Sequence, residues 1–73
     1  MKVYLCDHSK QRIKERLISI KDLTIALQNV TMKVPAKKKG RYKICGSVNA
    51  RLLWVIYEIK KNSTYFIITA YWA

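Results

Sequence analysis

Glycine, histidine and cysteine are scarce in this sequence, and each shortage excludes a class of site. The two glycines, Gly40 and Gly46, cannot form a glycine-rich phosphate-binding loop. The single histidine, His8, and the two cysteines, Cys6 and Cys45, have neither the number nor the spacing of a zinc site. The cysteines do not form a disulfide framework either, so we expect both to be reduced.

Acidic residues are almost as scarce, with four in 73 positions. Asp7 and Asp22 stand where they can cap helices, and Glu58 lies near the end of an apolar stretch. Glu15 is then left without a second carboxylate for the acid–base pair of a glycosidase. A set of carboxylates that could hold Mg²⁺ is missing as well. We therefore expect neither a metal nor another cofactor.

Long apolar runs are also missing. The longest uncharged run, residues 62–73, is shorter than the roughly 20 residues that a spanning helix needs, and its Tyr, Thr and Ile are typical of a strand. The first residues do not have the composition of a secretory signal. We therefore expect a cytoplasmic protein that is not inserted in a membrane.

Positive charge is what the chain has in abundance. Fifteen Lys and Arg residues against four acidic ones give a net charge of +11, while 51% of the positions are apolar. The apolar fraction indicates one folded domain, residues 1–73, rather than a disordered basic tail. The charge indicates a polyanionic partner, which is nucleic acid, an anionic membrane surface or an acidic protein.

The first part of the chain has the pattern of two helices. Residues 8–17 lack Gly and Pro, and a helix there places Ile13 and Leu17 on one side. Ser19 and Asp22 have the spacing of a capping box, which predicts the start of a second helix. The apolar face of that helix is expected to consist of Ile20, Leu23, Leu27 and Val30.

The rest of the chain has the pattern of strands joined by tight turns. Pro35 places the strand expected at residues 31–37 at a sheet edge. The strand expected at residues 52–59 is apolar on both faces and belongs in the centre of the sheet. A two-residue turn is expected at Asn49-Ala50, and residues 2–5 form either a short extra strand or a lead-in. The fold class is α+β: two N-terminal helices packed on one face of an antiparallel sheet of three to four strands. The main strands are expected at residues 31–37, 41–48, 52–59 and 65–72.

Three basic side chains, each four residues from the next, form a stripe on the first predicted helix. They are His8, Arg12 and Arg16, with Glu15 beside them. Metal-free cleavage of RNA needs a base for the 2′-OH, an acid for the leaving oxygen and a cation for the phosphate. Histidine titrates in the range for either proton transfer, and arginine binds phosphate oxygens. A solvated helix face with one histidine is the alternative interpretation.

Two further groups of residues are candidates for contact with RNA. Such contacts come from cations that follow the backbone and from aromatic rings that stack on unpaired bases. Tyr71 and Trp72 are candidates for stacking, whereas Trp54 and Phe66 are expected in the core. The cations lie around a predicted hairpin, which can instead be a solubilising loop. Six of them occur within eleven residues: Lys33, Lys37, Lys38, Lys39, Arg41 and Lys43.

Short motifs occur in order along nearly the whole chain. They are His8-x-x-x-Arg12-x-x-Glu15-Arg16 with Ile18-Ser19, then residues 46–53 with Val55, and Ile67-Ile68-Thr69. Together they resemble the motifs of a small uncharacterised-domain family that is similar to the BrnT toxins and, more distantly, to the RelE-type toxins. Leu17 stands where that family usually has Gly, so the left-handed helix end must be made differently or be absent. Ala50 replaces a common turn glycine.

The resemblance implies a RelE/BrnT-like fold and a metal-independent RNA endonuclease, an mRNA interferase of a type II toxin–antitoxin system. His8, Arg12 and Arg16 match the helix motif, and Arg51 and Thr69 match the sheet motifs. His8 would then be the base or acid, and the arginines would bind the phosphate. The implied partners are RNA, including ribosome-bound mRNA, and an acidic antitoxin, and a homodimer is left open. The alternative function is a non-catalytic basic module that binds nucleic acid or an acidic protein.

Overall fold

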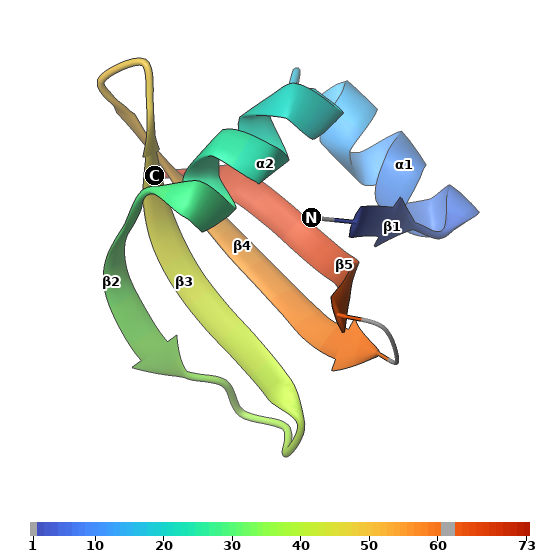
Figure 1. The fold of residues 1–73 in the computed structure, drawn as a ribbon. Helices are drawn as coiled ribbons and strands as arrows, with labels where there is room; N and C mark the ends of the chain where they lie inside the picture. Colours follow the sequence, from blue (N-terminus) through green and yellow to red (C-terminus); the bar gives the residue numbers. More distant parts are fainter. Residues whose placement is uncertain (1, 61–62) are drawn as a thin grey trace.

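The structure is a computed structural model that describes residues 2–60 and 63–73. Figure 1 shows the strands as one twisted sheet, with α2 lying across it and α1 beside β1 and β5. The α+β class predicted from the sequence is confirmed. The elements in chain order are β1 (Lys2–Leu5), α1 (Asp7–Glu15), α2 (Ile20–Gln28), β2 (Val30–Pro35), β3 (Arg41–Val48), β4 (Arg51–Lys60) and β5 (Thr64–Trp72).

The five strands of the described residues form one sheet in the order β1-β5-β4-β3-β2. β1 pairs with β5 in parallel, from Lys2 opposite Thr64 to Leu5 opposite Ile67, and the other pairs are antiparallel. The sheet is therefore mixed, and it has more strands than the antiparallel sheet of three to four that the sequence predicts. As predicted, β2 with Pro35 lies at an edge and β4 lies in the centre.

Local capping and turn residues fix the ends of several elements. Ser19 and Asp22 form the predicted capping box, in which each side chain accepts a hydrogen bond from the backbone N–H of the other at 3.0 Å. The predicted two-residue turn joins β3 to β4, with Asn49 and Ala50 at φ 49° and 67°. Both residues occupy the left-handed region, as a type I′ hairpin turn requires.

α1 also ends on a left-handed residue, although that residue is not glycine. Leu17 has φ 56°, and its N–H donates to the Lys14 carbonyl at 3.1 Å. The N–H of Ile18 donates to the Ile13 carbonyl at 2.8 Å, which completes a Schellman ending. The expectation that this ending is made differently or is absent is therefore wrong. Leu17 is also not on the apolar side of the helix, since 86% of its surface is exposed.

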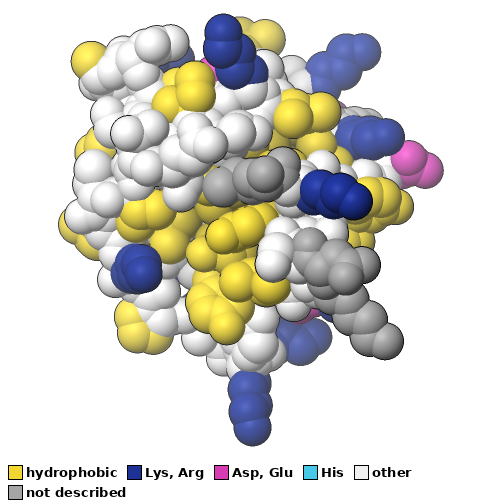
Figure 2. Space-filling view, viewed as in Figure 1, with side chains coloured by type: hydrophobic (Ala, Val, Ile, Leu, Met, Phe, Trp, Pro, Cys, Tyr) yellow, Lys and Arg dark blue, Asp and Glu magenta, His cyan; other side chains and the backbone are white. Residues whose placement is uncertain are grey.

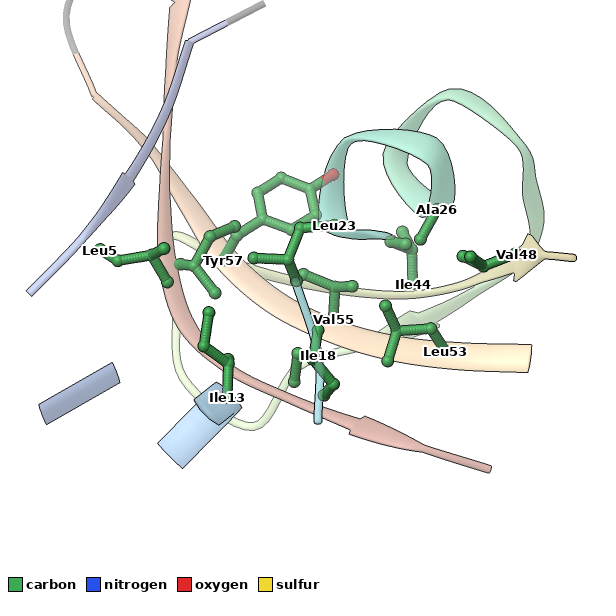
Figure 3. Packing of buried hydrophobic residues seen from close by; sticks show 12 residues of the cluster. Leu5, Ile13, Ile18, Leu23, Ala26, Ile44, Val48, Leu53, Val55 and Tyr57 are labelled. Atoms are coloured by element: carbon green, nitrogen blue, oxygen red, sulfur yellow. The ribbon is translucent and has the colours of Figure 1, made fainter. Parts of the chain in front are cut away.

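The core lies between the helices and one face of the sheet (Figure 3). α2 contributes Leu23 and Ala26, neither of which has exposed surface, while Leu27 packs against the cluster. Ile20 and Val30 were also predicted for this face, but they are 54% and 38% exposed. The cluster consists of Leu5, Ile13, Ile18, Leu23, Ala26, Ile44, Val48, Leu53, Val55, Tyr57, Ile67 and Ala70.

Gly46 allows α2 to approach β3 closely. A Cβ atom at this position would lie 2.1 Å from the Ala26 carbonyl oxygen. Just beyond the helix, the Asn29 carbonyl accepts a hydrogen bond from the Ser47 N–H at 3.0 Å. The helix backbone is therefore held directly on the strand, and the absence of a side chain at residue 46 makes this contact possible.

The other face of the sheet carries a second set of side chains. Successive residues of a strand point to opposite faces, so Trp54 and Phe66 point away from the core residues Leu53 and Ile67 beside them. Both rings are partly exposed and lie outside the core cluster. The prediction that they belong to the core is wrong, because an apolar strand pattern does not show which face is covered. This surface, which we call the open face, comprises Tyr4, Lys43, Trp54, Ile56, Glu58, Lys60, Phe66 and Tyr71.

Candidate nucleic-acid interface

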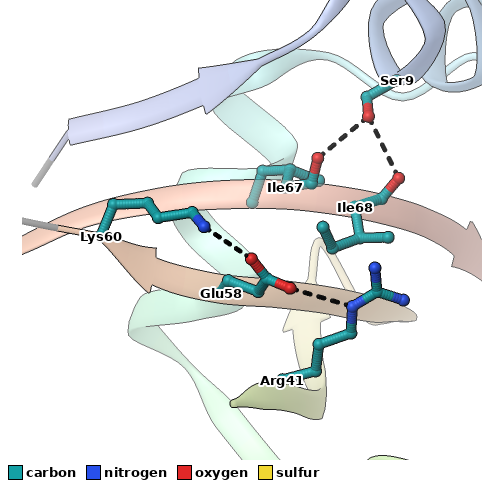
Figure 4. A network of polar contacts seen from close by, with 6 residues as sticks. All are labelled: Ser9, Arg41, Glu58, Lys60, Ile67 and Ile68. Atoms are coloured by element: carbon teal, nitrogen blue, oxygen red, sulfur yellow. Dashed lines mark hydrogen bonds and ion pairs between the residues drawn. The ribbon is translucent and has the colours of Figure 1, made fainter. Parts of the chain in front are cut away.

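α1 covers the part of the β5 edge that β1 leaves unpaired. β1 pairs with β5 only as far as Ile67. At that point the Ser9 hydroxyl of α1 donates to the carbonyls of Ile67 and Ile68 at 3.0 and 3.1 Å (Figure 4). Ser9 is 2% exposed, so these bonds satisfy groups that water does not reach. The first helix is thereby fixed against the last strand.

Arg16, which directly follows α1, is held on the same strand. Its Nη1 donates to Thr69 Oγ1 at 3.0 Å and to the Ala70 carbonyl at 2.8 Å. The Trp72 Nε1 donates to the Arg16 carbonyl at 3.1 Å, and the Arg51 guanidinium lies 4.0 Å from the centroid of the Trp72 ring. Arg16 thus contacts Thr69 through its guanidinium and Trp72 through its carbonyl, while Arg51 lies over the Trp72 ring. We call these four residues the α1–β5 corner.

His8 and Arg12 are exposed on α1. Arg12 lies about one helical turn before Arg16. His8 lies about two turns before Arg16, and these eight residues correspond to about 12 Å along the helix axis. A phosphate held by Arg16 and Arg51 would therefore lie well away from the imidazole. Of the four residues predicted to be catalytic, the structure brings together Arg16 and Arg51 and leaves His8 apart.

The basic hairpin predicted from the sequence consists of β2, β3 and the loop between them. Arg41 Nε lies 3.1 Å from Glu58 Oε2, and Lys60 Nζ lies 2.9 Å from Glu58 Oε1 (Figure 4). These hydrogen bonds, that of Lys60 first, lower the pKa of the Glu58 carboxyl. Glu58 therefore stays ionised and neutralises part of the charge of Arg41 and Lys60. The four lysines of the hairpin that are exposed are Lys33, Lys37, Lys38 and Lys39.

A groove of about 550 Å³ opens at this hairpin, within the size range of ligand-binding clefts. Lys43 belongs both to the groove and to the open face. Its Nζ lies 5.0 Å from the ring centroid of Trp54 and 5.9 Å from that of Tyr71. We call this cleft the basic groove. Its lining combines four apolar residues, Val34, Pro35, Ala36 and Ile56, with four cations, Lys37, Lys38, Arg41 and Lys43.

The basic groove and the α1–β5 corner lie at opposite ends of β3 and β4. Arg41, at the groove, pairs with Glu58, whereas Val48 at the other end of β3 pairs with Arg51. The seven steps from Arg41 to Val48 correspond to about 24 Å. An RNA strand in contact with both sites would therefore have to run along the length of the central strands.

The two aromatic residues predicted to stack on bases point to opposite faces of the sheet. Tyr71 pairs with Trp54 on the open face, whereas Trp72 pairs with Leu53 on the core side. Trp72 packs against the core cluster and beneath the Arg51 guanidinium. Tyr71 is therefore the member of this pair that lies on the open face.

On the face of the molecule in Figure 2, separate Lys and Arg side chains lie around an apolar patch, and few atoms of Asp or Glu are visible. On the core side of the sheet, Tyr42, Tyr57 and Tyr65 form a row with centroid distances of 5.4 and 5.2 Å. Lys33 lies beside this row in a hollow of about 380 Å³. Neither this row nor the exposure of Trp54 is predicted from the sequence, because both depend on how the strands pair and on which face the helices cover.

No helix within residues 2–60 and 63–73 is long and apolar enough to cross a membrane, and no three His, Cys, Asp or Glu side chains there are grouped as metal ligands. Cys6 and Cys45 are free thiols.

No family model, curated protein or solved structure matches the chain.

Proposed function

We propose that this protein binds RNA, with the basic groove as the main contact for the phosphate backbone. The observation that supports this function is the presence of four cations and four apolar residues around one cleft of about 550 Å³. Phosphate groups suit the cations, and a ribose or base suits the apolar lining. The net charge of +11 adds a long-range attraction for RNA over the whole surface.

Binding of this kind depends on the release of counterions from the RNA. Each phosphate neutralised on a single strand contributes about −0.7 to the slope of log K against log salt. Lys37 and Lys38 line the groove and are exposed. We therefore expect the double variant Lys37→Ala/Lys38→Ala to bind single-stranded RNA more weakly, with a slope that is smaller in magnitude by about 1.4.

The matched control is Lys10→Ala/Lys21→Ala, which removes the same charge from exposed positions on α1 and α2. Fluorescence anisotropy with a labelled RNA of mixed sequence, measured over a series of salt concentrations, gives the slope for each protein. A larger loss in the groove variant than in the control supports the proposal. Equal losses in the two variants would show that the groove is not the site of contact.

As a second candidate function, we propose that the bound RNA is cleaved without a metal beside α1. The meeting of Arg16 and Arg51 around Trp72, at positions that match the toxin-like motifs, favours this function. A base would take the proton of the 2′-OH as its oxygen attacks the adjacent phosphorus, and an acid would give a proton to the leaving 5′-oxygen. His8 would fill one of these two roles and water the other. Arg12, about one turn from His8, would stabilise the charge on that phosphate, while Arg16 and Arg51 would bind the RNA strand further along.

The wider biological setting belongs to this second candidate. It includes a RelE/BrnT-like toxin fold, a cytoplasmic location, ribosome-bound mRNA as substrate and an acidic antitoxin that covers the basic surface. Charge complementarity supports the antitoxin, since a protein of net charge +11 attracts an acidic partner. The same attraction supports the alternative of a non-catalytic module that binds nucleic acid or an acidic protein.

The test for cleavage is incubation of the protein with single-stranded RNA of mixed sequence in EDTA. His8→Ala and Arg12→Ala are suitable variants because both side chains are exposed, so the fold is expected to tolerate them. Fragments from the wild type that are absent from both variants would support a metal-independent nuclease. Intact RNA with all three proteins, with and without ribosomes, would exclude cleavage and leave RNA binding as the function.

A further inference from the structure

The open face of the sheet bears four aromatic side chains that the core does not account for. They come from three strands: Tyr4 from β1, Trp54 from β4, and Phe66 and Tyr71 from β5. Tyr4 is 53% exposed, and the other three are partly exposed. All four lie outside the buried core cluster. Their rings therefore present apolar surface to solvent on the side of the sheet away from the core.

One half of this aromatic set is continuous with the basic groove. Trp54 and Tyr71 are directly paired across β4 and β5, and the Nζ of Lys43 lies 5.0 and 5.9 Å from their ring centroids. Lys43 also lines the groove with Lys37 and Lys38. A chain of cations therefore leads from the groove to the two rings.

The other half has the same combination of rings and a lysine. Phe66 stacks on Tyr4 with a centroid distance of 5.0 Å and 27° between the planes, and Lys60 Nζ lies 5.6 Å from the Phe66 ring. Glu58, which pairs with Phe66, is four residues along β4 from Trp54. The two aromatic groups are therefore on the order of 14 Å apart along the strands.

We propose that the open face is a stacking platform for the unpaired bases of single-stranded RNA, whose backbone continues into the basic groove. This inference rests on the proposed RNA binding. It adds that the RNA is single-stranded and that the open face binds its bases. Every base has a π-face that can stack on an aromatic ring, and bases are free to do so only where they are unpaired. Lys43 and Lys60 lie over the rings in the free protein, and their flexible side chains move onto phosphates when bases take their place.

The charge of the open face favours RNA over a second copy of the chain as its occupant. Lys43 and Lys60 would be buried between two open faces, beside rings that they contact. Each copy carries a net charge of +11, so two copies repel each other. Phosphates supply an opposite charge for Lys43, whereas Lys60 already has that of Glu58.

The test compares two ligands of equal charge: a mixed-sequence single-stranded RNA and an abasic ribose-phosphate chain of the same length. Tyr71→Leu removes a ring from the open face but keeps apolar bulk, and the matched control Tyr42→Leu removes a ring from the core side, where Tyr42 is 49% exposed. We expect the wild type to prefer RNA. We expect Tyr71→Leu to lose at least about fivefold in affinity for RNA and nothing for the abasic chain, and Tyr42→Leu to keep the preference.

Each other outcome overturns a defined part of the inference. Equal affinity of the wild type for RNA and the abasic chain would overturn the platform and leave phosphate binding in place, whereas binding of neither ligand would overturn the proposed function as well. A preference for RNA that is undiminished in Tyr71→Leu would also overturn the platform. Phe66→Leu is measured in the same way if circular dichroism shows that Tyr71→Leu does not fold. Sedimentation of the wild type as a dimer that Tyr71→Leu dissociates would assign the open face to a second copy.

Discussion

Replacement of Leu17 by glycine is expected to stabilise the protein, although it removes a large apolar side chain. Leu17 ends α1 at φ 56°, where a residue with a Cβ atom is about 1–2 kcal/mol less stable than in the right-handed region. Its side chain is 86% exposed, so its removal costs little burial. Glycine also makes the unfolded chain more flexible, which lowers the free energy of unfolding by about 0.4–1 kcal/mol. The net expectation is a gain of about 0.5–1 kcal/mol in the free energy of unfolding.

Urea denaturation followed by circular dichroism measures this gain as a higher midpoint at an unchanged slope. In thermal unfolding, 1 kcal/mol corresponds to a rise of about 4–8 °C for a domain of this size. Leu17→Ala is the matched control, because it shortens the side chain but keeps the Cβ atom and therefore the unfavourable φ. A loss of stability in Leu17→Gly, with no change in Leu17→Ala, would refute the left-handed ending of α1.

Two further perturbations test packing and charge. Gly46→Ala is expected to lower the free energy of unfolding by about 1–3 kcal/mol, because the new Cβ would lie 2.1 Å from the Ala26 carbonyl oxygen and α2 would have to move. Urea denaturation measures this loss, and an unchanged midpoint would contradict the close approach of α2 to β3. The pKa of Glu58 is lowered by Lys60 and Arg41, so the stability that this carboxylate contributes is present at neutral pH and is lost as the pH falls through its folded-state pKa. Thermal unfolding over a pH series should show a smaller loss in acid for Glu58→Gln than for the wild type, and equal losses would mean that these ion pairs do not stabilise the fold.

The parts of the fold that could be predicted are those set by residues close in the sequence. The capping box at Ser19 and the turn at Asn49-Ala50 each depend on a few neighbouring side chains and backbone angles. The edge position of the strand with Pro35 depends on one missing N–H. Each of these expectations agrees with the structure, because the interactions that produce them need no knowledge of the rest of the chain.

The parts that could not be predicted depend on residues far apart in the sequence. The helical spacing predicts that Arg16 belongs to a stripe on the helix surface, but its side chain binds Thr69, 53 residues later. The apolar pattern of β4 predicts that Trp54 belongs to the core, because the alternation of a strand identifies two faces without showing which one a helix covers. The same difference holds for the candidate RNA contacts. The lysines of the hairpin are close in the sequence and can be predicted as a group, whereas the aromatic residues that share a face with Lys43 are known only from the pairing of the strands.

The covering of the β5 edge by β1 and α1 also bears on aggregation. An unpaired strand edge is a template for the strands of other chains, and a sheet must offer two such edges before it can grow into a fibril. At β5 that template is occupied by β1 and by the bonds from Ser9 and Arg16. β1 is then the edge strand on this side, and its four residues make it a short template for another chain. At β2, the other edge, Lys33 adds charge and Pro35 has no N–H to donate. Both sides of the sheet therefore carry features that hinder the addition of a strand from another chain.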